Sequence, residues 1–113
     1  MQEFIDSLNR GEFRVPVCTL CKSKVWPPSY YCPSCLSKTS LQIVDTNGTL
    51  LYFTTSYLKG MEGCYGLVDM AGMKVIGSFD TYLELKEGLQ VKMVRCGLKP
   101  NGTPYFFFEP IKG

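Results

Sequence analysis

Four cysteines with the spacing of metal ligands are the residues of this chain best suited to chemistry. They form two Cys-x-x-Cys pairs, Cys18 with Cys21 and Cys32 with Cys35. Each such turn places two thiolates on one side of a tight backbone knuckle, and two facing knuckles supply four sulfurs at tetrahedral angles. Four protein ligands leave no position open for water, so the metal cannot activate a nucleophile. The spacing predicts a structural Zn²⁺ site.

Two other uses of these cysteines compete with zinc. Disulfide pairing is typical of secreted domains, but residues 1–6 lack the apolar core of a signal peptide. Iron in an electron-transfer centre is the harder competitor, because Cys32-Pro33-Ser34-Cys35 resembles a rubredoxin knuckle. Such knuckles usually carry glycine directly after the second cysteine, where this chain has Lys22 and Leu36. This difference favours zinc, although it does not decide between zinc and iron.

Composition argues against several other functions. The chain has 113 residues, no histidine and a formal net charge of +2. Ser-His and Cys-His nucleophile pairs are therefore excluded, as is a histidine-ligated catalytic metal. The small net charge argues against strong non-specific binding to nucleic acid. No stretch is apolar enough to span a bilayer, and with no signal peptide expected, the sequence predicts a cytoplasmic protein.

A short helix is expected ahead of the metal site. Phe4, Ile5 and Leu8 fall on one face of a helical pattern that Gly11 ends. Because so short a helix does not persist alone in water, this face must pack on the protein's own body or on a partner subunit. Trp26, between the knuckles, either covers the metal site or belongs to a contact surface. The sequence leaves these alternatives open.

After residue 41 the composition becomes rich in residues that favour strands. A short linking strand is expected at residues 41–44, followed by five barrel strands at residues 48–57, 65–70, 74–79, 90–96 and 103–110. Ala71-Gly72 and Asn101-Gly102 predict tight turns. Five strands interrupted after the third is the order of an OB-fold barrel, although SH3-like barrels give similar patterns. Cys64 and Cys96 lie in or beside apolar runs, so they are predicted to be buried, and the sequence leaves open whether they are free or form a disulfide.

The order of these parts resembles a family of thiolase-associated proteins that combine a rubredoxin-like zinc ribbon with an acyl-CoA-associated OB-fold domain. The motifs that carry the resemblance are Cys18-Thr19-Leu20-Cys21, Pro27-Pro28, Cys32-Pro33-Ser34-Cys35, residues 48–57 and Leu85-Lys86-Glu87-Gly88-Leu89-Gln90-Val91. The resemblance implies a mainly β chain with a helical segment at residues 1–14, the zinc ribbon at 15–40 and the OB-fold barrel at 41–113. It also implies Cys18, Cys21, Cys32 and Cys35 as zinc ligands.

The resemblance further implies a function. Members of this family form complexes with thiolases or related acyl-CoA condensing enzymes. The chain is therefore expected to be a non-catalytic accessory or scaffold subunit that contacts or guides acyl-CoA thioesters. Its candidate partner contacts are Phe4, Ile5, Leu8 and Trp26.

The alternative function is binding of single-stranded nucleic acid, because OB barrels and zinc ribbons recur in that role and bases stack on exposed aromatic rings. Alternation along residues 105–108 puts Phe106 and Phe108 in the barrel core and leaves Tyr105 and Phe107 facing outward. Only Tyr105 and Phe107 are then available for stacking with the bases of a nucleic acid.

Overall fold

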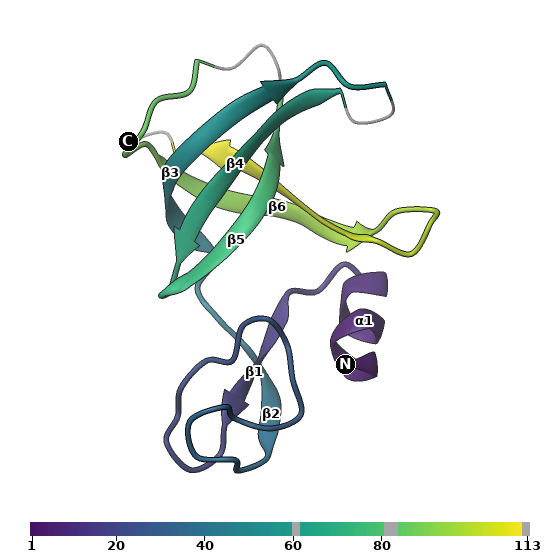
Figure 1. Cartoon of the computed structure of the whole chain (residues 1–113), viewed down its shortest axis with the longest axis vertical. Coiled ribbons are helices and arrows are strands. Elements are labelled where there is room, and N and C mark those ends of the chain that lie inside the picture. The colour runs from purple at the N-terminus through teal and green to yellow at the C-terminus, as the bar shows by residue number, and fades with distance from the viewer. Residues whose placement is uncertain (60–61, 81–83, 112–113) are drawn as a thin grey trace. The chain divides into compact units, whose positions relative to one another are not determined.

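The structure is a computed structural model that describes residues 1–59, 62–80 and 84–111 (Figure 1). Its contacts divide the chain into two compact units, Met1–Val44 with Gly97–Pro104, and Asp45–Cys96 with Tyr105–Gly113. Within the described residues, one helix precedes seven strands, so the predicted mainly β fold class is confirmed. No helix in this part of the chain has the length and apolar character of a membrane span. The division at residues 14/15 and 40/41 stays a prediction.

The first unit contains helix α1 (Gln2–Asn9) and an antiparallel sheet of two strands, β1 (Arg14–Cys18) and β2 (Thr39–Ile43). Cys18, the last residue of β1, pairs with Thr39, the first residue of β2. The sheet therefore closes the loop of residues 19–38, which carries the other three ligand cysteines. Figure 1 shows this loop connecting β1 to β2.

Strand β1 was not predicted, because Pro16 stands in its middle. The Pro16 carbonyl accepts a hydrogen bond from the Val25 N–H at 2.8 Å. The carbonyl of Pro16 therefore points to the edge of β1 that faces Val25, away from β2. Because the missing N–H of Pro16 would point to this same edge, its absence does not affect pairing with β2. Proline is tolerated on such an edge, and the strand forms around it.

Helix α1 packs on its own unit through an aromatic cluster. The ring centroid of Phe4 lies 5.6 Å from that of Trp26 and 6.4 Å from that of Phe13, and Phe13 lies 5.9 Å from Trp26. Phe4 and Leu8 are buried, and Ile5 is half-buried. The apolar face expected of this helix is therefore covered largely by residues of the chain itself.

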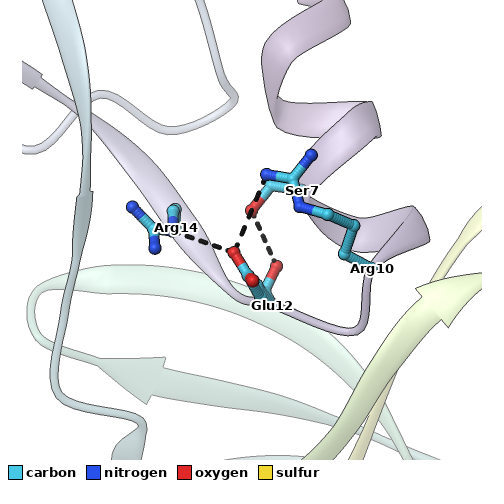
Figure 2. Close-up of polar contacts among 4 residues, drawn as sticks. All are labelled: Ser7, Arg10, Glu12 and Arg14. Atoms are coloured by element: carbon cyan, nitrogen blue, oxygen red, sulfur yellow. Dashed lines mark hydrogen bonds and ion pairs between the residues drawn. The ribbon is translucent and has the colours of Figure 1, made fainter.

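Polar contacts fix the turn that leads from α1 into β1 (Figure 2). The fully buried Ser7 hydroxyl donates to the Glu12 carbonyl at 3.0 Å. The Glu12 carboxylate accepts a hydrogen bond from Nε of Arg14 at 3.1 Å and lies 3.7 Å from the Arg10 guanidinium. Gly11 has a φ of 75°, as the predicted left-handed cap requires. Because the ion pairs are partly exposed, the buried Ser7 contact is the stronger constraint.

The second unit is built on a closed barrel with the strand order β3-β4-β5-β7-β6. The strands are β3 (Asn47–Ser56), β4 (Gly63–Met70), β5 (Met73–Phe79), β6 (Gln90–Leu98) and β7 (Pro104–Pro110). All five predicted strands are present, with ends shifted by no more than two residues. Strand β3 pairs with both β4 and β6, and a parallel contact between Ser78 of β5 and Phe107 of β7 closes the barrel. This is the arrangement predicted as an OB-fold.

Two glycines make room for the aromatic core of the barrel. Phe79 and Phe108 are buried and stack with their ring centroids 5.9 Å apart. Gly66 and Gly77 pair with each other across β4 and β5. A Cβ atom at Gly66 would overlap Phe79, and one at Gly77 would overlap the ring of Phe108. Glycine is needed at both positions because the rings lie directly against the backbone.

The predicted inward and outward positions near the end of the chain are also found. Phe106 and Phe108 are buried, as alternation along β7 predicted. The Arg95 guanidinium carbon lies 4.8 Å from the centroid of the Phe107 ring, so a cation covers one face of this outward aromatic residue. Cys64 and Cys96 are buried, as expected, and both are free cysteines.

Candidate metal centre

The four predicted ligand cysteines converge at the end of the small sheet. Their Sγ atoms all lie within 4.8 Å of one another. The sulfur of Cys35 is 3.2 Å from that of Cys18 and 3.8 Å from that of Cys21, and Cys21 is 3.7 Å from Cys32. Zn–S bonds of about 2.3 Å in a tetrahedron require S–S edges of about 3.8 Å. The donor set and its spacing therefore fit one Zn²⁺ held by four thiolates.

Each knuckle is turned by a residue other than glycine in the left-handed conformation. Lys22 has a φ of 64° and Leu36 a φ of 60°. The Lys22 N–H donates to the Cys18 carbonyl at 3.0 Å, and the Leu36 N–H donates to the Cys32 carbonyl at 2.8 Å. The rubredoxin-type turn thus forms without glycine. Lysine and leucine therefore take the conformation for which glycine was expected, and the absence of glycine does not by itself distinguish the two metals.

Burial divides the four sulfurs into two pairs. Cys18 and Cys32 are 0% and 1% exposed, whereas Cys21 is exposed and Cys35 is half-buried. Cys18, Cys32 and Val25 form a small buried cluster, on which Cys35 packs. A cluster of this size is too small to stabilise the loop of residues 19–38. The bonds to the metal must therefore supply the stability that a hydrophobic core would otherwise give.

Hydrogen bonds tune the sulfurs unequally. The Ser23 hydroxyl lies 3.3 Å from Cys21 Sγ, and this hydroxyl with the Ser23 N–H lowers the pKa of Cys21 to about 6. The Ser37 N–H, followed by the Cys18 thiol and the Ser37 hydroxyl, lowers the pKa of Cys35. Because metals bind the thiolate, a lowered pKa reduces the cost of deprotonating these ligands.

The pKa of Cys18 is shifted in the opposite direction. The N–H groups of Cys21 and Leu20 both donate to its sulfur at 3.4 Å. The Cys21 N–H favours the thiolate, but burial and the neighbouring Cys35 thiol outweigh it and raise the pKa of Cys18. The buried sulfur therefore depends on the positive charge of the metal to stay ionised.

Sequence reasoning missed the two serines that contact the ligands. Ser23 and Ser37 each lie two residues after the second cysteine of a pair, and this repeated spacing was the available signal. The predicted partner residues lie elsewhere in the unit. Phe4 and Leu8 are buried under the chain, and Trp26 is half-buried. Their role in binding a partner stays a prediction.

A second candidate site is an apolar surface on the outside of the barrel. The register places Tyr52, Leu67 and Ile76 in one row across β3, β4 and β5. Tyr52 is outward, although Leu50 is buried, because a bulge between them shifts the pairing. The row borders a hollow of about 290 Å³ that has no charged residue in its lining. This outer apolar face consists of Tyr52, Phe53, Thr54, Tyr65, Gly66, Leu67 and Ile76.

The fold and the site together define a four-cysteine zinc ribbon joined to a five-stranded barrel. Residues 6–40 match the family model described as the ChsH2, rubredoxin-like zinc ribbon domain. This match spans both knuckles and confirms the predicted ribbon.

The arrangement as a whole also occurs in a solved structure. The chain is similar to "Ltp2-ChsH2(DUF35) aldolase", with a TM-score of 0.77 and 16% sequence identity over 96% of this chain and 92% of that chain. At this identity the likeness establishes a shared fold. No curated protein sequence matches the chain.

Proposed function

We propose that this chain is a non-catalytic accessory subunit of a thiolase or a related enzyme that condenses acyl-CoA thioesters. The observation that carries the proposal is the shared architecture: ribbon and barrel together align over 96% of the chain with a structure described as Ltp2-ChsH2(DUF35) aldolase. In this proposal the catalytic groups belong to the partner, and the chain supports the partner and the path of the acyl-CoA thioester.

The chemistry of the chain supports a non-catalytic role. Its sequence has no histidine, and all four positions of a tetrahedral metal are taken by cysteine. The other two cysteines, Cys64 and Cys96, are buried in the barrel, and burial raises the pKa of Cys96. A buried thiol that resists ionisation is a poor nucleophile. The reduced thiols that the metal site needs also support the expected cytoplasmic location.

The outer apolar face is the surface that we propose to meet the catalytic subunit. Tyr52 and Ile76 are 63% and 68% exposed, and the lining of the hollow carries no charge. The cores of protein interfaces are depleted in charged residues and enriched in aromatic ones. An uncharged, apolar patch on the catalytic subunit is the surface that complements this face.

The expected nucleic-acid alternative receives less support. Of the two outward aromatic residues near the end of the chain, Phe107 has the Arg95 guanidinium over its ring. Stacking of a base on that face would first have to displace the cation. A titration with labelled single-stranded DNA at low salt tests this alternative, which requires an affinity that falls steeply as salt is added.

Co-purification tests the proposed function. The chain is co-expressed with a candidate acyl-CoA condensing enzyme from the same genome, and the mixture is analysed by size-exclusion chromatography. We expect the two proteins to co-elute, and we expect turnover of the acyl-CoA substrate by the enzyme to fall when the chain is left out. Separate elution with unchanged turnover would contradict the proposal.

A further inference from the structure

The two knuckles share a pattern that extends beyond the cysteines. Both run Cys-x-x-Cys-x-Ser, at residues 18–23 and 32–37. In each, the serine carbonyl accepts the N–H of the first cysteine at 2.9 Å. The residue just before the serine has a positive φ in both knuckles. Two segments of different sequence therefore close in the same way and place a serine at the same point.

The left-handed residue turns each serine back over the second cysteine of its pair. The Ser23 hydroxyl lies 3.3 Å from Cys21 Sγ. At the other knuckle, Ser37 stands at the same place relative to Cys35, because the same left-handed residue precedes it and the same carbonyl contact closes the turn. Cys21 and Cys35, the two cysteines beside these serines, are the more solvent-accessible ones, whereas Cys18 and Cys32 are buried.

We propose that Ser23 and Ser37 are positioning residues that shield the two accessible thiolates of the zinc site from electrophiles. Four thiolates carry twice the charge of one divalent ion, so negative charge stays on the sulfurs and keeps them nucleophilic. A hydroxyl donating to a sulfur draws off part of that charge. The buried pair is protected by burial, and the accessible pair is protected by serine.

The proposal predicts which sulfur reacts first when a serine is lost. Alkylation by iodoacetamide forms an S–C bond at the attacking sulfur and expels iodide, and the modified sulfur then binds zinc weakly. In Ser23→Ala the first label should fall on Cys21, and in Ser37→Ala on Cys35. The backbone N–H and carbonyl of the knuckle are retained in both variants, so the turn itself should still form.

The experiment follows zinc release from the zinc-loaded full chain with a chromogenic chelator during alkylation, and maps the first labelled cysteine by mass spectrometry. We expect release to be about 10-fold faster in each alanine variant, the usual size of an outer-shell effect on a metal site. Ser23→Thr, which keeps the hydroxyl, should retain the original rate. Ser34→Ala is the matched control, because Ser34 is exposed within the second knuckle and none of the described contacts joins its hydroxyl to a sulfur.

Three results would overturn the proposal. One is a release rate in Ser23→Ala and Ser37→Ala equal to that of Ser34→Ala. Another is faster release with the label spread evenly over all four cysteines, which would indicate general loosening of the ribbon. The third is failure of the alanine variants to take up zinc, which would show that the serines build the site and do not shield it.

Discussion

Leu36 tests directly how the second knuckle is built. Its φ of 60° lies in the left-handed region, which costs a residue with a Cβ atom about 1–2 kcal/mol. Leu36→Gly removes that cost but adds about 0.4–1 kcal/mol of chain entropy to the unfolded state. The side chain is 75% exposed, so little packing is lost. We therefore expect a net stabilisation of about 0.5–1 kcal/mol.

Zinc affinity is the suitable assay, because folding of a ribbon of this kind is coupled to metal binding. A gain of this size corresponds to zinc binding about 2- to 5-fold tighter in competition with a chelator. Leu36→Ala is the control, since it shortens the side chain but keeps the Cβ atom and the strain. Weaker zinc binding in Leu36→Gly, or an equal gain in Leu36→Ala, would refute the reasoning.

Three further predictions concern other parts of the chain. Gly77→Ala should destabilise the barrel by about 1–3 kcal/mol in urea unfolding, because its Cβ would overlap the Phe108 ring, and an unchanged midpoint would contradict this packing. Ile76→Glu, which puts a charge on the outer apolar face, should abolish co-elution with the catalytic subunit. Lys92→Glu, on the exposed side of β6, should leave co-elution unchanged, and equal behaviour of the two variants would argue against this face as the contact surface. Removing zinc with a chelator should collapse the dispersed NMR amide signals of residues 6–40 and preserve those of the barrel strands, and retention of both sets would show that the ribbon folds without metal.

Much of the fold could be predicted because its signals are local. Alternating apolar residues and the Ala71-Gly72 turn, where both residues have positive φ, defined the β4–β5 hairpin from sequence alone. The ligand cysteines were equally clear, since their spacing carries the chemistry. Strand β1 was missed because a proline argues against a strand. The strand forms here because Pro16 directs its carbonyl to the edge that does not pair with β2, which the sequence does not show.

Other features depend on contacts that no local pattern encodes. The partner of the α1 face could not be predicted, because Phe13 and Trp26, which cover Phe4, come from separate segments of the chain. The glycine rule failed at Leu36, where hydrogen bonds and the metal site hold a leucine in the left-handed region. The outer apolar face was missed because a bulge in β3 turns Tyr52 outward, and the sequence does not mark that bulge.

The central claim is that four cysteine sulfurs close around one zinc ion and hold the ribbon together. Its most direct test is elemental analysis of the full chain, freshly purified without chelators. The structure predicts one equivalent of zinc per chain. A variant in which both Cys18 and Cys32 are replaced by serine should bind none. Material that is folded over residues 6–40 yet carries no stoichiometric metal, or carries iron in place of zinc, would contradict it.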